Sequence, residues 1–305
     1  MKQEIEEKYP LNISSLLKNT PSTYILSCKE GDYILKILDH NPEDIIYRIS
    51  ILHLSFINLP IKSKKGKLVE KYFDSYMTIF SLFEEDYSNL NDIKLDFYIR
   101  SIATLHSSSS YPIKVNDGFF DESIQYIDKC ISLKKEEYNA KMSVFEREDY
   151  HSPFEWMFIL NYQKLHKALL EAERNLSLLE ENWKKSKNVH LSLTYNNFSY
   201  SHILAKSGKL ISIEKMKLSS SIYDLVDFIN NTFKEKVDIA YYLNEYLSIH
   251  PLEDYEKYWL LSIVYIPTFS FLEKEIDNIS SLYNSLSLLD ACDSIEEVIL
   301  SLDER

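Results

Sequence analysis

The apolar pattern of this 305-residue chain changes its period once, and that change constrains the fold more than any other feature. Over roughly the first eighty residues, short β-branched and aromatic runs alternate with turn residues, which is typical of strands. From Asn91 onward, apolar residues recur every three and four positions, which is typical of one face of a helix. This order predicts an α+β protein with a small β-rich N-terminal part and a large helical C-terminal part.

The clearest strand signal is a hairpin near the N-terminus. Thr23 to Ser27 and Tyr33 to Leu38 are β-branched and aromatic runs, and Lys29 to Asp32 supply the turn with Gly31. A helix is predicted to follow from Pro42 to about Phe56. Two further strands are then expected over residues 67–72 and 76–83. The predicted order is therefore strand, strand, helix, strand, strand.

Helices dominate the remainder of the predicted order. The helix that begins near Asn91 is expected to end at the serine run 107–110, and its buried face is predicted to contain Leu95, Tyr98, Ile99, Ile102 and Leu105. A long helix is predicted from Pro153 to Lys187, with Ser152 as its N-cap. Residues 189–217 return to strand-like alternation around a turn at 206–209, and the chain from Ile222 onward is predicted to be helical with breaks at Pro251 and Pro267.

Composition excludes several classes of function. The net charge of -13 and the scattered Lys and Arg residues predict no nucleic-acid partner. Cys28, Cys130 and Cys292 lie far apart and match no metal spacing, which favours a reducing compartment and therefore a cytoplasmic protein. No apolar run reaches the ~20 residues of a membrane span, and the charged N-terminus does not predict a signal peptide. The four glycines are dispersed, so no glycine-rich phosphate loop is predicted.

Several short strings, in this order of elements, resemble the aminoglycoside phosphotransferase and choline kinase group, the small-molecule branch of the protein-kinase-like fold. YILKI, over residues 33–37, resembles the strand that carries the nucleotide-binding lysine, and residues 102–106 resemble the end of a family helix. LTYNNFSYSHIL, residues 193–204, aligns without a gap on a family string of the form L-x-H-G-D-x-x-x-x-N-I-L. LISIE, ending at Glu214, stands in the place of the family's V-x-I-D, and SIYDL at 221–225 resembles P-x-Y-D-L.

The resemblance implies a bilobal kinase-like fold with a β-rich N-lobe over residues 1–84 and a helical C-lobe over 85–305. The C-lobe would carry the degenerate catalytic hairpin at 190–217. Spore-coat and other Gram-positive bacterial proteins include degenerate members of this fold, so the resemblance also allows a spore-associated location.

The resemblance further assigns roles to five residues. Lys36 would hold the nucleotide phosphates, Asn197 stands at the position of the catalytic base, and His202 and Glu214 stand at the two metal positions. Asp224 would support the catalytic loop. An alternative alignment anchored on the HLS string at 190–192 keeps Asn197 as a metal ligand, but it leaves seventeen residues before Glu214 where the family has about twelve. In either alignment the catalytic aspartate is missing.

These departures favour a pseudokinase, a kinase-like scaffold that acts as a binding or regulatory module. Its ligand would be a protein or a small molecule in the cleft between the lobes, and binding of ATP and Mg²⁺ is left open. The alternative is an atypical, active phosphotransferase that uses Lys36 for the phosphates and Glu214 for Mg²⁺, with Asp224 or His202 activating the acceptor. A third reading, a purely helical structural protein, requires the strand-rich part to be misread.

Each of these residues also has an ordinary structural interpretation. Lys36 suits a solvated edge strand, and Asn197 with Asn196 suits a turn. His202 suits a hydrogen-bonded core histidine. Glu214, which interrupts an apolar strand, could pair with Lys215 at the surface. Asp224 suits the first turn of a helix, where exposed backbone amides stabilise a carboxylate.

Overall fold

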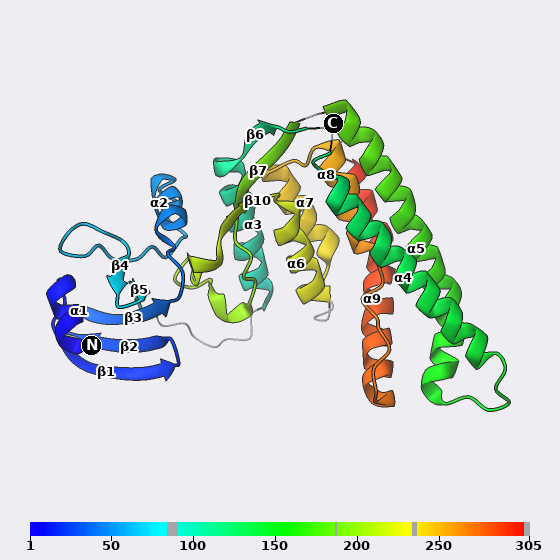
Figure 1. The fold of residues 1–305 in the computed structure, drawn as a ribbon, viewed down its shortest axis with the longest axis horizontal. Helices are drawn as coiled ribbons and strands as arrows, with labels where there is room; N and C mark the ends of the chain where they lie inside the picture. Colours follow the sequence, from blue (N-terminus) through cyan, green and yellow to red (C-terminus); the bar gives the residue numbers. More distant parts are fainter. Residues whose placement is uncertain (84–90, 117, 187, 234–236, 302–305) are drawn as a thin grey trace. The chain divides into compact units, whose positions relative to one another are not determined.

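A computed structural model describes residues 1–83, 91–116, 118–186, 188–233 and 237–301 (Figure 1). The chain divides into two compact units. The first unit comprises Met1–Ser109 and Leu193–Leu218, and the second comprises Ser110–Ser192 and Ser219–Arg305. The predicted lobe boundary at 84/85 falls outside the described residues and stays a prediction. The α+β composition is confirmed.

A five-stranded antiparallel sheet forms most of the first unit (Figure 1). Its strand order is β1-β2-β3-β5-β4. The bounds of these strands are β1 Ile13–Thr20, β2 Thr23–Cys28, β3 Gly31–Leu38, β4 Glu70–Tyr72 and β5 Ser75–Ser81. The predicted β2–β3 hairpin is confirmed, whereas β1 and the short helix α1 (Lys2–Lys8) were not predicted. The sheet therefore has three strands before the first predicted helix, not two.

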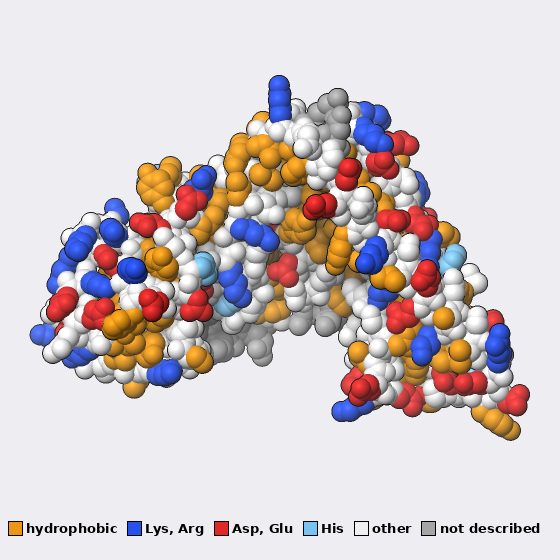
Figure 2. All heavy atoms as spheres, in the orientation of Figure 1, with side chains coloured by type: hydrophobic (Ala, Val, Ile, Leu, Met, Phe, Trp, Pro, Cys, Tyr) orange, Lys and Arg blue, Asp and Glu red, His pale blue; other side chains and the backbone are white. Residues whose placement is uncertain are grey.

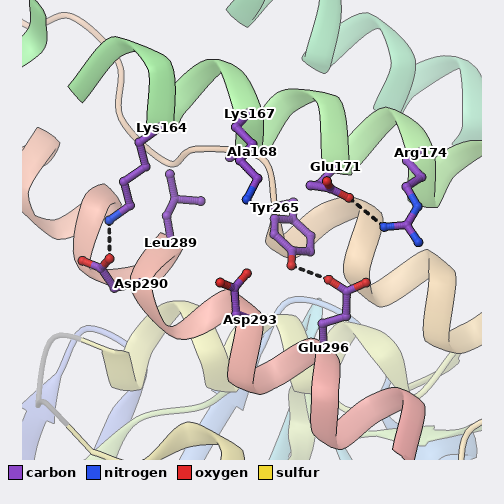
Figure 3. Close-up of a pocket in the computed structure, with 10 residues that line it drawn as sticks. All are labelled: Lys164, Lys167, Ala168, Glu171, Arg174, Tyr265, Leu289, Asp290, Asp293 and Glu296. Carbon is purple, nitrogen blue, oxygen red and sulfur yellow. Dashed lines mark hydrogen bonds and ion pairs between the residues drawn. The ribbon is translucent and has the colours of Figure 1, made fainter. Parts of the chain in front are cut away.

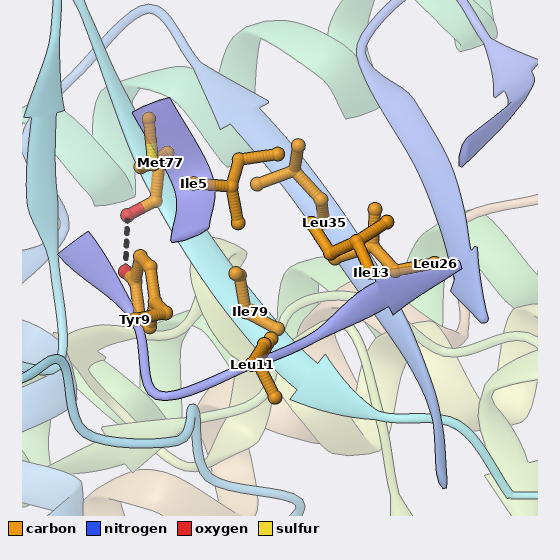
Figure 4. Packing of buried hydrophobic residues seen from close by; sticks show 8 residues of the cluster. All are labelled: Ile5, Tyr9, Leu11, Ile13, Leu26, Leu35, Met77 and Ile79. Carbon is orange, nitrogen blue, oxygen red and sulfur yellow. Dashed lines mark hydrogen bonds between the residues drawn. The ribbon is translucent and has the colours of Figure 1, made fainter. Parts of the chain in front are cut away.

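Helix α1 packs on one face of this sheet and closes a compact apolar cluster (Figure 4). Ile5 and Tyr9 are fully buried against strand residues such as Leu35. The Tyr9 hydroxyl donates to the Met77 carbonyl at 3.4 Å, and burial raises the pKa of Tyr9. Side chains alternate between the faces of a strand, so Leu35 in the cluster sends its neighbours Ile34 and Lys36 to the opposite face. The core thus fixes where Lys36 points.

Two helices complete the first unit. Helix α2 (Glu43–Ile51) ends before the predicted Phe56. Helix α3 (Asn91–Ser109) matches its predicted span, and all five residues of its predicted buried face are buried. The other segment of the first unit, Leu193–Leu218, begins at the end of β7 (Asn188–Thr194). There the Thr194 hydroxyl donates to the Lys217 carbonyl at the start of β10 (Lys217–Ser219).

The second unit is mainly helical (Figure 1). It contains a short antiparallel pairing of β6 (Tyr111–Lys114) with β7, and six helices described in full: α4 Asp121–Phe145, α5 Pro153–Ser186, α6 Ile222–Thr232, α7 Ile239–Ile249, α8 Asp254–Val264 and α9 Glu275–Leu300. Helix α5 begins as predicted, since Ser152 and Glu155 cap each other's backbone amides. Its predicted last residue, Lys187, lies outside the described residues. Helix α4 was not predicted.

The surface carries mixed charge. Figure 2 shows Lys and Arg side chains interspersed with Asp and Glu over the face that it draws. A face of this kind offers no extended basic track for a phosphate backbone. The absence of a nucleic-acid partner stays a prediction. Among the residues described, none of the helices combines the length and the apolar character that crossing a bilayer requires.

Candidate nucleotide-like site

A cavity of about 540 Å³ lies within the first unit and brings together segments that are far apart in sequence. Strands β3 and β5 supply one wall, because Ile34 pairs in register with Phe80 and both line the cavity. Leu204 and Ile211, from the hairpin after β7, supply apolar side chains of their own. Residues 81–83, at the end of β5 and just after it, line the same cavity. A volume of this size with mostly apolar walls is typical of a small-molecule site.

Lys36 lies in this cavity and binds Glu214, 178 residues away. The Lys36 Nζ is 2.6 Å from the Glu214 Oε1 and 3.0 Å from the Ser212 Oγ, to which it also donates. The two side chains are only 16% and 12% exposed, so the ion pair is largely shielded from water. The sequence interpretation required Lys36 and Glu214 to come together, and the structure places them in contact.

Two of the ordinary interpretations are wrong at this point. Strand β3 lies between β2 and β5, so Lys36 is not a solvated lysine on an edge strand. Glu214 does not lie in a strand: it belongs to a short 3₁₀ helix, Ile213–Lys215. Ser212, just before that helix, has a left-handed backbone with φ 59° and ψ 44°. This turn reverses the strand-like alternation and directs both Ser212 and Glu214 toward Lys36.

The hairpin that carries Glu214 is anchored through its backbone. Strands β8 (Ile203–Leu204) and β9 (Lys209–Leu210) pair around the turn at Gly208, which has a φ of 62°. Leu210 exchanges backbone hydrogen bonds with the segment after α2, donating to the Phe56 carbonyl at 2.7 Å and accepting from Asn58 at 3.0 Å. These bonds hold the hairpin against the N-terminal sheet region of the same unit, which explains how the pair with Lys36 is positioned.

Asn197 is held by two hydrogen bonds in the loop before this hairpin. Its Nδ2 donates to the Ser212 carbonyl at 3.0 Å, and its own carbonyl lies 3.0 Å from the His202 Nδ1. Since a carbonyl only accepts, His202 Nδ1 carries the proton in this contact. Asn196 has a positive φ of 51°, which confirms the turn conformation predicted for this pair of asparagines. An amide at position 197 cannot accept a proton from an acceptor hydroxyl.

Aromatic residues fix the same loop against helix α3. Tyr195 is fully buried, and its hydroxyl donates to the Ile211 carbonyl at 2.5 Å. The Tyr98 ring makes edge contacts with Tyr195 and Phe198 at centroid distances of 5.9 and 4.8 Å. Lys94, which lines the cavity, donates to the Tyr200 carbonyl at 3.0 Å. The loop is therefore held by both polar and aromatic contacts.

Glu214 and His202 differ in how well they suit a hard cation such as Mg²⁺. The Glu214 Oε2 is buried and has no hydrogen-bond partner among the described residues, so one carboxylate oxygen is available. Mg²⁺ is often held by one or two carboxylates together with substrate phosphates. His202 offers only imidazole nitrogen, which suits Mg²⁺ poorly. The residues present therefore fit a cation held by Glu214, and they do not fit one held by His202.

The remaining predicted site residue, Asp224, belongs to the second unit. It is fully buried in the first turn of α6, as the helix-start interpretation expected. Its role in supporting a catalytic loop stays a prediction.

One other group of possible metal ligands occurs in the second unit. Glu148, His151 and Glu155 have ligand atoms within 4.8 Å of one another. Glu155 already accepts the Ser152 amide in the capping box of α5, and the His151 ring packs edge-on against Trp156. We assign these side chains to the start of α5 and not to a metal centre.

Sequence reasoning missed several cavity residues. Ser212 stands two residues before Glu214 in the LISIE string, and the sequence analysis assigned it no role. Phe80 and Lys94 carried no motif, and only the pairing of β3 with β5 and the position of Lys94 near the start of α3 bring them to the cavity. The Lys36 Nζ lies 5.6 Å from the Phe80 ring centroid, a cation–π contact.

The fold of the chain is similar to that of known solved structures. An aminoglycoside phosphotransferase from Alicyclobacillus acidocaldarius subsp. acidocaldarius DSM 446 superposes with a TM-score of 0.71 at 10% identity, covering 100% of this chain and 96% of that one. The chain has the aminoglycoside phosphotransferase fold. The predicted protein-kinase-like α+β fold is therefore confirmed.

Spectinomycin phosphotransferase APH(9)-Ia shares this phosphotransferase fold. Its AMP-bound complex gives a TM-score of 0.55 at 13% identity, covering 98% of this chain and 97% of that one. Its complex with ADP and spectinomycin gives 0.52 at 14% identity, covering 97% and 92%. No protein-family model matches the chain, and no curated protein matches it significantly.

Proposed function

We propose that the chain is a pseudokinase with the aminoglycoside phosphotransferase fold that binds an adenine nucleotide in the first-unit cavity and does not transfer its phosphate efficiently. The proposal rests on finding a largely buried Lys36–Glu214 ion pair together with an amide, not a carboxylate, at position 197. The pair retains the phosphate-binding end of the site, while the amide removes the base. Such a protein would act as a binding or regulatory module.

The cavity supports binding of a purine. Ile34 and Phe80 on one wall and Leu204 and Ile211 on the hairpin present apolar surfaces to a planar ring. Residues 19–25, around the β1–β2 turn, contain no glycine. Phosphates would therefore depend on Lys36 more than on backbone amides. The solved complexes of APH(9)-Ia with ADP and AMP make an adenine nucleotide the first ligand to test.

The Lys36–Glu214 pair predicts that a divalent cation strengthens nucleotide binding. In the pair, the charge of Lys36 is neutralised at 2.6 Å by Glu214. A cation on the free Oε2 would offset the negative charge of Glu214, so that Lys36 attracts phosphates more strongly. The cation itself would supply charge neutralisation when bound.

An atypical, active phosphotransferase is the second candidate. The available Glu214 Oε2 favours it, because a metal position is retained. Its base would have to be His202 or Asp224. The His202 Nδ1 is engaged with the Asn197 carbonyl, so only its other ring nitrogen is left to accept a proton. We therefore rank this candidate second.

Isothermal titration calorimetry with ATP, with and without Mg²⁺, tests the proposal. We expect ATP to bind the wild type and to bind more tightly with Mg²⁺. Ser201→Trp should abolish binding, because Ser201 is exposed and lines the cavity, which an indole would fill. Ser15→Trp, on the exposed side of β1, is the matched control and should bind like the wild type.

A phosphate-transfer assay on the same samples separates the two candidates. With spectinomycin, choline and other hydroxyl acceptors, the pseudokinase should show no turnover above that of Glu214→Ala. Turnover that disappears in Glu214→Ala would establish the second candidate. Absence of any ATP binding at millimolar concentration would overturn both.

A further inference from the structure

The second unit contains a cavity of about 740 Å³ that the nucleotide site does not use. It lies among α4, α6 and α8 and the segment that follows α8, all within that unit (Figure 1 labels these helices). Its inner wall includes Ile127 and Trp259, which are 4% and 5% exposed. Two tyrosines, Tyr126 and Tyr223, line the same space and are 70% and 41% exposed. The volume is within the range of pockets that hold drug-sized ligands.

The walls are apolar and aromatic. Val226 and Ile263 add aliphatic surface, and the Tyr223 ring meets the Trp259 ring edge-on at 5.7 Å. A ligand that contains a ring could therefore stack on the exposed aromatic rings and also pack against the buried apolar side chains. The packed interior of the unit does not fill this space, so the wall residues gain contacts when an apolar ligand enters.

Two charged residues, Glu122 and Lys134, line the cavity. Glu122 is exposed on the first turn of α4. Lys134 donates to the Phe269 carbonyl and to the Ser270 hydroxyl, so its ammonium group is already bound to the chain. A charged group that enters between these apolar walls would therefore lose hydration, because the Lys134 ammonium is already bonded to two oxygens of the chain and the Glu122 carboxylate is exposed.

Uncharged hydrogen-bonding groups complete the lining. Ser123, Asn230 and Thr268, whose side chains carry a hydroxyl or an amide, also line the cavity. Such groups orient a neutral polar substituent without requiring an ion. Cys130, half-buried on α4, lines the same wall and gives the site a chemical reporter.

We infer that this cavity is a binding site for an uncharged, ring-bearing small molecule. It is formed by α4, α6 and α8 and is independent of the nucleotide site. The ligand's rings lie against Trp259, Tyr223 and Ile127, and Asn230 or Ser123 binds its polar substituent.

Two fluorescent probes that share their ring system test the class of ligand. N-phenyl-1-naphthylamine is uncharged, and 8-anilinonaphthalene-1-sulfonate adds one sulfonate to the same rings. With the 305-residue chain, we expect the uncharged probe to bind saturably at one site. The sulfonate should bind at least about tenfold more weakly, because its charge would lose hydration between apolar walls while the Lys134 ammonium is already bonded to two oxygens of the chain. Equal or tighter binding of the sulfonate would overturn the assignment of an uncharged ligand.

Filling the cavity tests its location. Ser123→Phe places a ring inside the space and should abolish binding of the uncharged probe. Ser143→Phe, on an exposed turn of the same helix, is the matched control and should bind like the wild type. If Ser123→Phe loses its near-ultraviolet circular dichroism, Asn230→Phe replaces it from helix α6. Retained binding in a folded cavity-filling variant, or no saturable binding by the wild type, would overturn the site.

Labelling of Cys130 gives a readout that requires no substitution. N-ethylmaleimide modification, mapped by mass spectrometry, should slow at Cys130 when the uncharged probe is present, while Cys28 in the first unit reacts at an unchanged rate. Protection of both cysteines equally, or of neither, would contradict a probe bound in this cavity.

Discussion

Two lysine–carboxylate pairs, one in each unit, show how surroundings decide the importance of the same chemistry. Lys36 and Glu214 are 16% and 12% exposed and border an apolar-walled cavity. Lys164 and Asp290, joining α5 to α9, are 34% and 74% exposed. This second pair lines a cavity of about 240 Å³. Figure 3 shows it beside the ion pair of Glu171 with Arg174 and the hydrogen bond of Tyr265 to Glu296.

The two pairs differ in how well water can solvate one charge after its partner is removed. At the exposed pair, solvent stabilises either partner when the other is removed, so the pair contributes little to stability. At the shielded pair, loss of one partner leaves a charge in surroundings that solvate it poorly. The Lys36–Glu214 pair is therefore the more sensitive position of the two.

Breaking the shielded pair should have the largest effect. Glu214→Gln keeps the shape of the side chain and removes its charge, leaving Lys36 without a counter-charge. We expect the free energy of unfolding to fall by about 2 to 3 kcal/mol, somewhat less than for a fully buried pair. Chemical denaturation at pH 7 measures this change. A loss below ~0.5 kcal/mol would mean that the pair is as well solvated as a surface one.

A buried carboxylate that has no lysine partner sharpens the comparison. Burial raises the pKa of Glu256 from 4.5 to about 7, with Glu253 and Tyr255 as its neighbours. The folded state therefore holds this proton more tightly than the unfolded state, so the contribution of Glu256 to stability is fully present below pH 4.5 and is lost as pH rises through about 7. Glu256→Gln should reduce the difference in unfolding free energy between pH 5 and pH 8 by about 2 kcal/mol.

Denaturation curves at both pH values measure that difference. Asp254→Asn is the control, since Asp254 is exposed in the same helical turn and bonds Lys257. An unchanged pH dependence in Glu256→Gln would show that Glu256 does not titrate in this range.

Replacing both members of the shielded pair should restore part of the stability. Lys36→Met with Glu214→Leu removes both charges and keeps apolar volume, so no isolated charge is left behind. We expect the double variant to lose about 1 to 2 kcal/mol less than the sum of the single variants. Additive losses would show that the two residues do not act together. The double variant should still fail to bind ATP, because Lys36 is gone.

The exposed pair should show the smallest effect. Lys164→Met and Asp290→Asn should each change the free energy of unfolding by less than about 0.5 kcal/mol. Raising the salt concentration to 1 M should remove what remains, whereas it should change the effect of Glu214→Gln much less. A loss at Asp290→Asn as large as that at Glu214→Gln would contradict the distinction between the two pairs.

The sequence predicted those helices and strands in which apolar residues recur at a regular spacing or a capping or turn residue marks an end. The β2–β3 hairpin, the buried face of α3 and the capped start of α5 each carry their own signal within a few residues. Strand β1 carries none, because its sequence ISSLLKNT is mostly exposed and does not alternate. Helix α4 was missed since only four of its residues, widely spaced, are buried.

The site shows the same limit. Glu214 follows three apolar positions that alternate like a strand, and the left-handed Ser212 that ends this alternation has no sequence signature, since it is not glycine. For Glu214, the adjacent Lys215 was the expected ion-pair partner, yet the residue that Glu214 contacts is Lys36, 178 residues away. Only the resemblance to a kinase-like pattern linked Lys36 to Glu214. Local charge pairing gave the wrong partner because an ion pair is selected by the folded chain.

Phosphorus-31 NMR of ATP and Mg²⁺ mixed with the protein tests the central claim most directly, because one spectrum reports both binding and chemistry. We expect the ATP resonances to broaden or shift with the wild type and with Ser15→Trp, but not with Ser201→Trp. We also expect neither ADP nor a new phosphoester signal to accumulate over hours in the presence of hydroxyl acceptors. Unchanged ATP resonances with the wild type, or product signals that vanish in Glu214→Ala, would contradict this claim.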